Sequence, residues 1–132
     1  MHEWNIGIDV VDIARFERIN YFDHKAFYER VFTRGEIDYC LSFKDPAPHF
    51  ATSFAGKEAV YKAIRPCFHV KVWGIEILRD SLGAPHVRLD PISVHKQRQR
   101  FHVTVSLSHS PSHAVAIALA YAERKRRLSR GR

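Results

Sequence analysis

Residues 54–64 read Phe-Ala-Gly-Lys-Glu-Ala-Val-Tyr-Lys-Ala-Ile, and this stretch guides the interpretation of the whole chain. Its small and apolar residues at helical spacing predict a helix. On that helix Glu58 and Lys62 are four residues apart and share one face. Such a pair is often only an exposed ion pair worth about 0.3–0.5 kcal/mol. The stretch alone therefore leaves both a structural and a chemical role open.

Helices are also predicted on the N-terminal side of this stretch. The helix itself runs from about His49 to Ile64, between the breaker at residues 45–48 and Pro66. Thr33 and Glu36 form a capping box that starts an earlier helix. Apolar residues recur at helical spacing further upstream, which predicts one short amphipathic helix from Ile13 and another turn near Phe27; these positions are Ile13, Phe16, Ile19, Phe27 and Val31.

Strands are predicted at both ends of the chain. Residues 4–9 alternate apolar and polar side chains and end at Asp9, and residues 101–108 alternate in the same way. Residues 70–77 and 86–89 flank a turn at 80–85. Residues 114–122 are ambiguous, because their alanines favour a helix while Val115 and Ile117 allow a strand.

Length and composition indicate one ordinary globular domain. The chain has 132 residues, of which 45% are hydrophobic and 27% charged. Residues 121–132 hold six of the 21 basic side chains, so most of the net charge of +7 belongs to the end of the chain. We expect a domain at 1–122 and a basic tail at 123–132. The two cysteines, Cys40 and Cys67, predict reduced thiols rather than a disulfide framework.

Several classes of location and partner are not expected. No apolar run approaches the ~20 residues that a membrane span needs, so we expect no membrane association. The N-terminal residues do not resemble a signal peptide, which predicts a cytoplasmic protein. Nucleic acid is not an expected partner, because the basic charge lies in a tail rather than on a folded face and no stacking motif accompanies it. The sequence also lacks the motifs of P-loop NTPases, Rossmann dehydrogenases, zincins and α/β-hydrolases.

Two acids and one lysine indicate phosphoryl chemistry. Asp9 lies near the end of an apolar strand, beside Gly7, where α/β proteins place ligand groups. The alternative role is the N-cap of the helix that follows, which Asp12 could equally fill. Asp9 and Glu58 together could hold one Mg²⁺, which takes one or two carboxylates and completes its shell with water and phosphate oxygens. Lys62 would neutralise charge on the same phosphates. Phosphoryl transfer needs these parts, because its catalysis is mostly positioning and charge stabilisation.

The strand at 101–108 ends in a cluster of hydroxyls and histidines, at residues 106–113. These side chains could bind a phosphate or a ribose, or they could form an ordinary turn. His109 and His113 do not predict a zinc site, because Pro111 lies between them and no further ligands accompany them.

The order of these elements resembles one enzyme family, the holo-acyl-carrier-protein synthases, which are small 4'-phosphopantetheinyl transferases. The resemblance covers about residues 5–120, and its most specific piece is the lysine–glutamate helix. The matching segments are Gly7-Ile8-Asp9-Val10-Val11-Asp12-Ile13, Val31-Phe32-Thr33-Arg34-Gly35-Glu36, Phe54–Ala63, Ile75-Glu76-Ile77 with Gly83-Ala84-Pro85, and Val105-Ser106-Leu107-Ser108-His109-Ser110.

The resemblance implies an α+β fold with helices packed on a mainly antiparallel sheet, assembled as a homotrimer with active sites between subunits. It implies transfer of the phosphopantetheine arm of coenzyme A to a serine of an acyl carrier protein. Asp9 and Glu58 would bind Mg²⁺, Glu58 and Lys62 would be catalytic, and the proton acceptor would be Glu58 or a water on the metal. The implied coenzyme A ligands are Lys57, Lys62, Ser108 and His109. By the same resemblance, residues 114–122 should be a strand.

The carrier protein is acidic, so the resemblance implies docking on Arg15 and Arg18. Three features depart from the family pattern: Ser53 replaces an arginine, Ala84 replaces a lysine, and residues 64–69 replace a glycine-rich loop. These departures support an alternative function, a catalytically impaired member that binds coenzyme A or the carrier protein without transfer.

Overall fold

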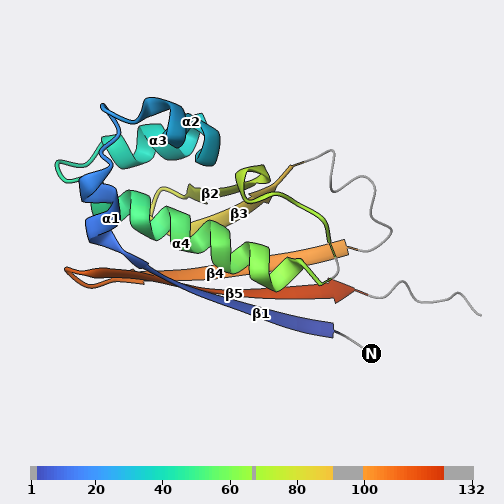
Figure 1. Cartoon of the computed structure of the whole chain (residues 1–132). Coiled ribbons are helices and arrows are strands. Elements are labelled where there is room, and N and C mark those ends of the chain that lie inside the picture. Colours follow the sequence, from blue (N-terminus) through green and yellow to red (C-terminus); the bar gives the residue numbers. More distant parts are fainter. Residues whose placement is uncertain (1–2, 67, 91–99, 124–132) are drawn as a thin grey trace, which may run out of the picture.

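A three-stranded antiparallel sheet forms the base of the molecule. The computed structural model describes residues 3–66, 68–90 and 100–123. The strands β1 (Glu3–Asp12), β5 (His113–Glu123) and β4 (Arg100–His109) lie side by side in the order β1-β5-β4. A separate antiparallel hairpin consists of β2 (Ile75–Arg79) and β3 (Pro85–Leu89), beside β4 (Figure 1). The fold is therefore α+β, as the sequence predicted.

The long helix α4 (Ala47–Ile64) covers one face of the sheet (Figure 1). Its buried side is rich in small residues, including Ala55, Ala59 and Ala63, and alanines also fill the inward positions of β5. Small residues on both surfaces let the helix backbone approach the strands closely. This packing explains the ambiguous segment at 114–122: its alanines face the helix, whereas Val115 and Ile117 point to the other face of the sheet.

Three short helices close one end of the molecule: α1 (Ile13–Arg18), α2 (Lys25–Val31) and α3 (Arg34–Leu41). They enclose an aromatic cluster in which Tyr28 is fully buried and its hydroxyl donates to the Ile19 carbonyl at 2.6 Å. The rings of this cluster pack mostly edge to face, which suits their quadrupoles; they are Phe16, Tyr21, Tyr28, Phe32, Phe50 and Phe54.

Most predicted elements are confirmed, but several boundaries are shifted. The strand expected at 70–77 runs over Ile75–Arg79, and the strand expected at 4–9 continues past Asp9 to Asp12. The capping box of Thr33 and Glu36 is present at the start of α3. The helix α4 begins at Ala47 rather than near His49, because Pro48 lies in its first turn, where a missing amide hydrogen costs nothing. The turn at 80–85 contains Gly83 with φ +83°, a conformation that favours glycine. The basic tail after residue 123 lies outside the described residues.

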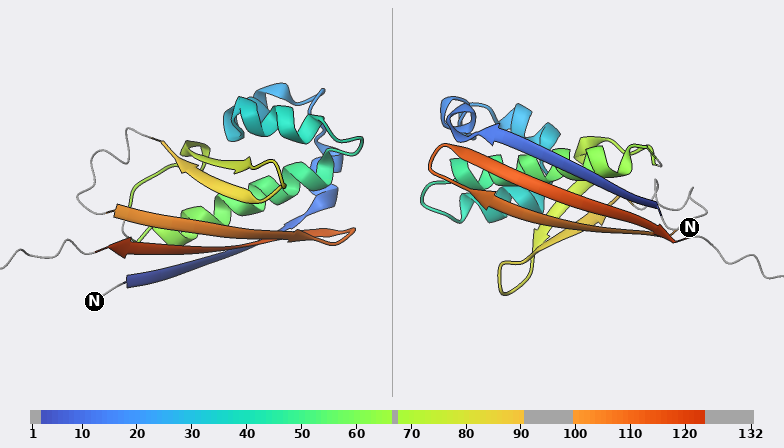
Figure 2. Two further views of the ribbon diagram at one scale, coloured as in Figure 1. Left: turned by 180° about the vertical axis from the view of Figure 1, so that it is seen from behind. Right: turned by 90° about the horizontal axis from the view of Figure 1, so that it is seen from below.

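The face of the sheet that α4 leaves uncovered is apolar. Figure 2 shows in its right-hand view the three strands with no helix over them. Large hydrophobic side chains point outward from β1 and β5, with Ile6 66% and Ile8 58% exposed; the others are Trp4, Val10, Val115 and Ile117. Within the described residues, no helix is long and apolar enough to cross a membrane.

Candidate active site

Asp9 and Lys62 meet where β1 passes under α4. The Lys62 ammonium lies 3.1 Å from Asp9 Oδ1 and also donates to the Ile8 carbonyl at 3.0 Å. The Asp9 side chain is only 17% exposed, whereas the Lys62 side chain is 49% exposed. Asp9 is therefore fixed against the helix, and Lys62 remains accessible to an anionic ligand.

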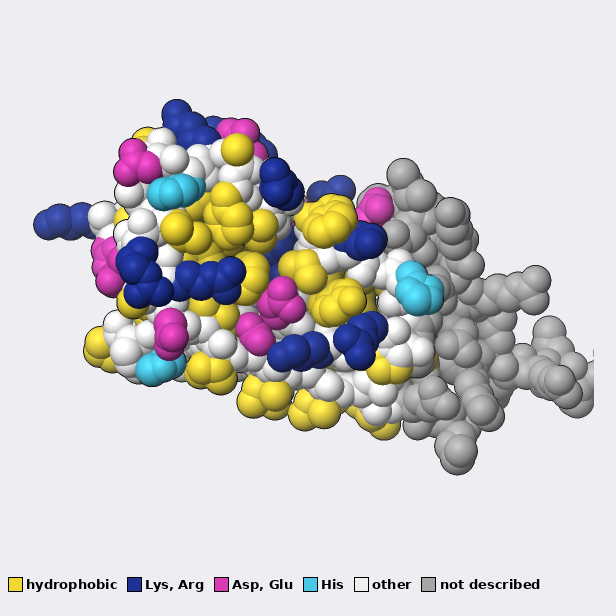
Figure 3. Space-filling view, viewed as in Figure 1, with side chains coloured by type: hydrophobic (Ala, Val, Ile, Leu, Met, Phe, Trp, Pro, Cys, Tyr) yellow, Lys and Arg dark blue, Asp and Glu magenta, His cyan; other side chains and the backbone are white. Residues whose placement is uncertain are grey.

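Glu58 lies beside this ion pair, and the three residues Asp9, Glu58 and Lys62 are called the acidic cluster below. Glu58 lies one helical turn before Lys62 and is partly buried. Burial, with the negative charge of Asp9, raises the pKa of Glu58, while the positive charges of Lys62 and Arg15 oppose the increase. The structure thus brings Asp9, Glu58 and Lys62 into one electrostatically coupled group. Figure 3 shows this face, with acidic side chains between lysine and arginine side chains.

The donor set of this cluster suits Mg²⁺. It offers two carboxylates, and Mg²⁺ prefers one or two carboxylates together with water and substrate phosphates. Among residues 3–66, 68–90 and 100–123, no group of three or more histidines, cysteines, aspartates and glutamates is placed to hold a metal. The cluster therefore fits a metal that shares its coordination with a bound phosphate better than a metal caged by protein.

Lys57 lies elsewhere, although we expected it among the coenzyme A ligands. Its side chain is completely buried, and its ammonium lies 2.7 Å from Glu36 Oε1 and donates to the Ile75 carbonyl. Glu36 Oε2 in turn accepts from the Ile77 amide at 2.9 Å. Lys57 therefore ties α4 to α3 and β2 from inside the core, while its neighbour Glu58 turns to the surface.

Arg15 and Arg18 are exposed on α1, one turn apart. The Arg15 guanidinium lies 5.3 Å from the ring centre of Phe54, which is on α4. Arg15 is also close enough to Glu58 for its charge to lower the pKa of that carboxyl. The basic surface of α1 therefore borders the acidic cluster.

Ser108 and His109 lie on the opposite edge of the sheet from Asp9. They end β4, whereas Asp9 is on β1, and β5 separates the two strands. Ser108 pairs with Val115, whose side chain points to the uncovered face, and His109 lies beside His49 of α4 with 6.2 Å between ring centres. Within one chain, Ser108 and His109 are therefore separated from the acidic cluster.

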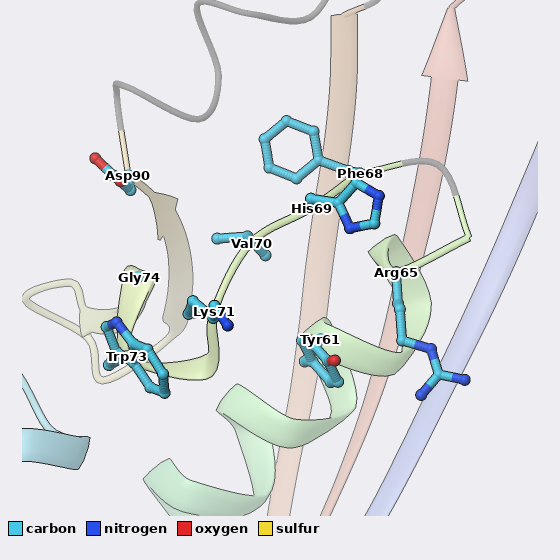
Figure 4. A pocket seen from close by; sticks show the side chains of 9 residues that line it. All are labelled: Tyr61, Arg65, Phe68, His69, Val70, Lys71, Trp73, Gly74 and Asp90. Carbon is cyan, nitrogen blue, oxygen red and sulfur yellow. The ribbon is translucent and has the colours of Figure 1, made fainter.

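A pocket that the sequence analysis did not identify adjoins the C-terminal end of α4. It has a volume of about 240 Å³ and lies between α4 and the segment at 68–74 (Figure 4). Tyr61 and Arg65 form one wall, and Trp73, with Lys71 5.5 Å from its ring centre, forms another. Trp73 is 58% exposed. It belongs to the short 3-10 turn η1 (Val72–Gly74), which the sequence pattern did not predict.

The chain belongs to the 4'-phosphopantetheinyl transferase superfamily, whose family profile matches residues 5–120. Its relatives within that superfamily are holo-acyl-carrier-protein synthases. The protein of that name from Syntrophotalea carbinolica is 38% identical over 100 residues, which cover 74% of this chain and 78% of the relative. That from Geobacter sp. strain M21 is 39% identical over 88 residues, 65% of this chain and 70% of the relative.

A solved structure supports the same assignment. The Helicobacter pylori holo-acyl-carrier-protein synthase in complex with coenzyme A superposes with a TM-score of 0.74 at 30% identity. The match covers 87% of this chain and 98% of the other. The predicted family, fold and enzyme class are therefore confirmed.

Proposed function

We propose that this chain transfers the 4'-phosphopantetheine arm of coenzyme A to a serine of an acyl carrier protein, with Mg²⁺ as cofactor. The observation that carries the proposal is the convergence of Asp9, Glu58 and Lys62 where β1 meets α4. The membership of the superfamily supports the reaction class. The named activity of the relatives and the coenzyme A complex of one of them support the two substrates.

The charges in the cluster suit each step of this reaction. The serine oxygen of the carrier attacks the β-phosphorus of coenzyme A, a new P–O bond forms, and the bond to the α-phosphate breaks. Adenosine 3',5'-bisphosphate leaves with the electron pair. Asp9 and Glu58 would hold Mg²⁺, which when bound neutralises phosphate charge. The ammonium of Lys62 stabilises the negative charge that develops on the transferred and leaving phosphates.

The serine proton goes to Glu58 or to a water molecule, and both acceptors remain proposals. Glu58 suits the role because its raised pKa makes it a stronger base than an ordinary surface carboxylate. The positive charges of Lys62 and Arg15 oppose the increase in this pKa and so favour ionised Glu58, the form that can accept a proton.

The acidic carrier protein would dock on Arg15 and Arg18. Both side chains are exposed, and Arg15 borders Glu58. A carrier held there would bring its serine toward the acidic cluster. Opposite charges on the two surfaces would speed the encounter and make it sensitive to salt.

A homotrimer would complete the site. The uncovered face of the sheet carries six large hydrophobic side chains, more than a monomer normally leaves in water. Ser108 and His109 lie across the sheet from Asp9, so a second copy would have to supply them to the same coenzyme A molecule. The expected cytoplasmic location stays a prediction.

The alternative is a catalytically impaired member. Ser53 is buried beside Cys40, with 3.9 Å between their side-chain oxygen and sulfur, so it offers no charge to a ligand. Ala84 is exposed in the β2–β3 turn. Coenzyme A binding without transfer to any carrier would favour this alternative.

Mass spectrometry of an apo acyl carrier protein, incubated with this protein, coenzyme A and Mg²⁺, tests the proposal. The carrier should gain the mass of one phosphopantetheine arm, and EDTA should prevent the gain. Asp9→Ala and Glu58→Ala should each slow transfer at least about 100-fold while the fold persists. Asp38→Asn, which removes an exposed carboxylate on α3, is the matched control. Normal rates in both site variants would refute the metal site.

A further inference from the structure

A row of three aromatic side chains crosses the uncovered face of the sheet, which the right-hand view of Figure 2 shows. Trp4 on β1, Tyr121 on β5 and His102 on β4 occupy paired positions in the strand register. The ring centres of Trp4 and Tyr121 are 4.7 Å apart, and those of Tyr121 and His102 are 5.9 Å apart. Trp4 is 61% exposed, and so is the side chain of His102. Each edge of the sheet therefore carries a largely exposed ring at one end of this aromatic row.

The histidine at the β4 end of the row is oriented by a carboxylate. His102 Nε2 lies 3.1 Å from Glu123 Oε1, and both groups are on the surface of the single chain. In the described part of the chain, Glu123 and Tyr121, both on β5, are the titratable groups in contact with the His102 ring. A histidine changes its charge between about pH 5 and 8. The edge strand β4 thus presents a flat ring that becomes a cation at the lower end of this range.

The strand register places the aromatic row and the two halves of the proposed site at matching levels. Through β5, Asp9 is level with Leu107, the neighbour of Ser108 on the opposite edge of the sheet. A rotation about an axis parallel to the strands leaves such levels unchanged. A second copy related by this rotation brings its Ser108 beside Asp9, as the proposed homotrimer requires. The same rotation brings its His102 beside Trp4.

We infer that Trp4 of one copy packs on His102 of the next copy in the proposed homotrimer, and that this contact fixes the level at which the two edge strands meet. The inference rests on the proposed function. The five other large hydrophobic side chains on this face are aliphatic, and their burial has no directional preference. The contact between two flat rings depends on their geometry, and protonated His102 adds a cation–π attraction. It prevents the edge strands from sliding, which would separate Ser108 from Asp9.

The fluorescence of Trp4 tests the contact, because a protonated imidazole quenches indole emission when the two rings touch. In one chain β5 lies between Trp4 and His102, so their strands are two spacings or about 10 Å apart. The protein carries Trp73→Phe, which leaves Trp4 as its one tryptophan. In the trimer, emission should rise as the pH increases from about 5 to about 8. A trimer whose emission does not change over this range would overturn the inference.

Two changes should remove the rise in emission: the substitution His102→Gln, and dilution until analytical ultracentrifugation shows the mass of one chain. His2→Gln is the matched control, because it removes the histidine nearest to Trp4 in the sequence, and the rise should remain. A rise that persists in His102→Gln or in the diluted monomer would come from another group. Either result would contradict the contact between copies.

The transfer assay tests whether the contact sets the level of the strands. At concentrations where both proteins are trimers, His102→Gln should transfer about tenfold more slowly than the unmodified protein, because the reacting groups are misplaced. His102→Phe, which keeps a flat ring, should recover most of the rate. An unchanged rate in the His102→Gln trimer would overturn the positioning role. A trimer that shows the fluorescence change but modifies no carrier protein would refute the proposed function and leave the contact standing.

Discussion

A Cβ atom on Gly7 would lie 1.9 Å from the carbonyl oxygen of Ala59, so β1 and α4 touch backbone to backbone at this point. Two residues further along β1, Asp9 forms its ion pair with Lys62. The contact between Gly7 and Ala59 therefore sets the distance between the strand and the helix that carry the acidic cluster. Any side chain at position 7 would force the two elements apart.

Gly7→Ala should reduce both stability and activity. The added methyl group has no space, and overpacking of this severity costs about 3 kcal/mol or more in the free energy of unfolding. Separation of β1 from α4 also moves Asp9 away from Lys62, so the fraction that folds should transfer slowly. Urea unfolding and the carrier modification assay measure the two effects.

Gly35→Ala is the matched control for this substitution. A Cβ at position 35 would meet its nearest atom, Glu76 Oε2, at 3.4 Å, an ordinary contact on the exposed side of α3. Because alanine is the better helix former, Gly35→Ala should be neutral or stabilising by up to about 1 kcal/mol. Equal stabilities of the two variants would contradict the role of Gly7.

Only part of the acidic cluster could be predicted from local geometry. The spacing of Glu58 and Lys62 places them on one face of a helix. Asp9 is 53 residues from Lys62, so its place beside them was expected only from the tendency of α/β proteins to carry ligand groups near strand ends and from the family resemblance. The burial of Lys57 could not be predicted in this way. Its partner Glu36 is 21 residues away, and a helical pattern shows only that Lys57 and Lys62 occupy different faces.

Lys57→Met should destabilise the protein strongly. Burial lowers the pKa of Lys57, and the charge of Glu36 opposes this decrease. Removing the lysine leaves the Glu36 carboxylate buried without its counter-ion, which costs about 3–5 kcal/mol in the free energy of unfolding. The exposed pair Arg34–Asp38 is the comparison, since Arg34→Met should cost less than about 1 kcal/mol.

The double variant Lys57→Met with Glu36→Gln should recover part of this loss, because no buried charge remains unpaired. Urea unfolding of the two single variants and the double variant measures the coupling between the residues. Additive effects would mean that the two side chains act independently. That result would contradict the buried ion pair.

Glu58→Gln should stabilise the metal-free protein at neutral pH. The folded-state pKa of Glu58 lies above its usual value of 4.5, so the folded state binds this proton more tightly than the unfolded state. Ionised Glu58 therefore lowers stability at pH values above its folded pKa, and the cost disappears as the pH falls below 4.5. The stability difference between Glu58→Gln and the unmodified protein should disappear over the same range.

Urea unfolding at a series of pH values, without Mg²⁺, measures this difference. Glu29→Gln removes an exposed carboxylate on α2 and should change stability by no more than about 0.5 kcal/mol. A difference for Glu58→Gln that is constant across the pH series would contradict the strained position of Glu58. Stability lost in this way is available to bind a cation between Glu58 and Asp9.

Charges on the uncovered face of the sheet should dissociate the proposed trimer. Ile6 and Ile117 lie on neighbouring strands and are 66% and 43% exposed in the single chain. Ile6→Glu with Ile117→Glu would place carboxylates in an apolar interface, where burial without partners is strongly unfavourable. The mass measured by analytical ultracentrifugation should fall from three times the 15.3 kDa of one chain to the mass of one chain. Transfer activity should fall with it, because Ser108 and His109 would no longer reach the Asp9 cluster of another copy.

Leu82→Ser separates this effect from a general change in surface polarity. Leu82 is 93% exposed in the turn between β2 and β3, away from the sheet face. Its replacement should leave both the oligomeric mass and the transfer rate unchanged. A double variant that is monomeric yet fully active would refute the shared site, because one chain would then suffice. An unmodified protein that sediments as a monomer would refute the trimer itself, and a different partner would have to cover the six hydrophobic side chains on β1 and β5.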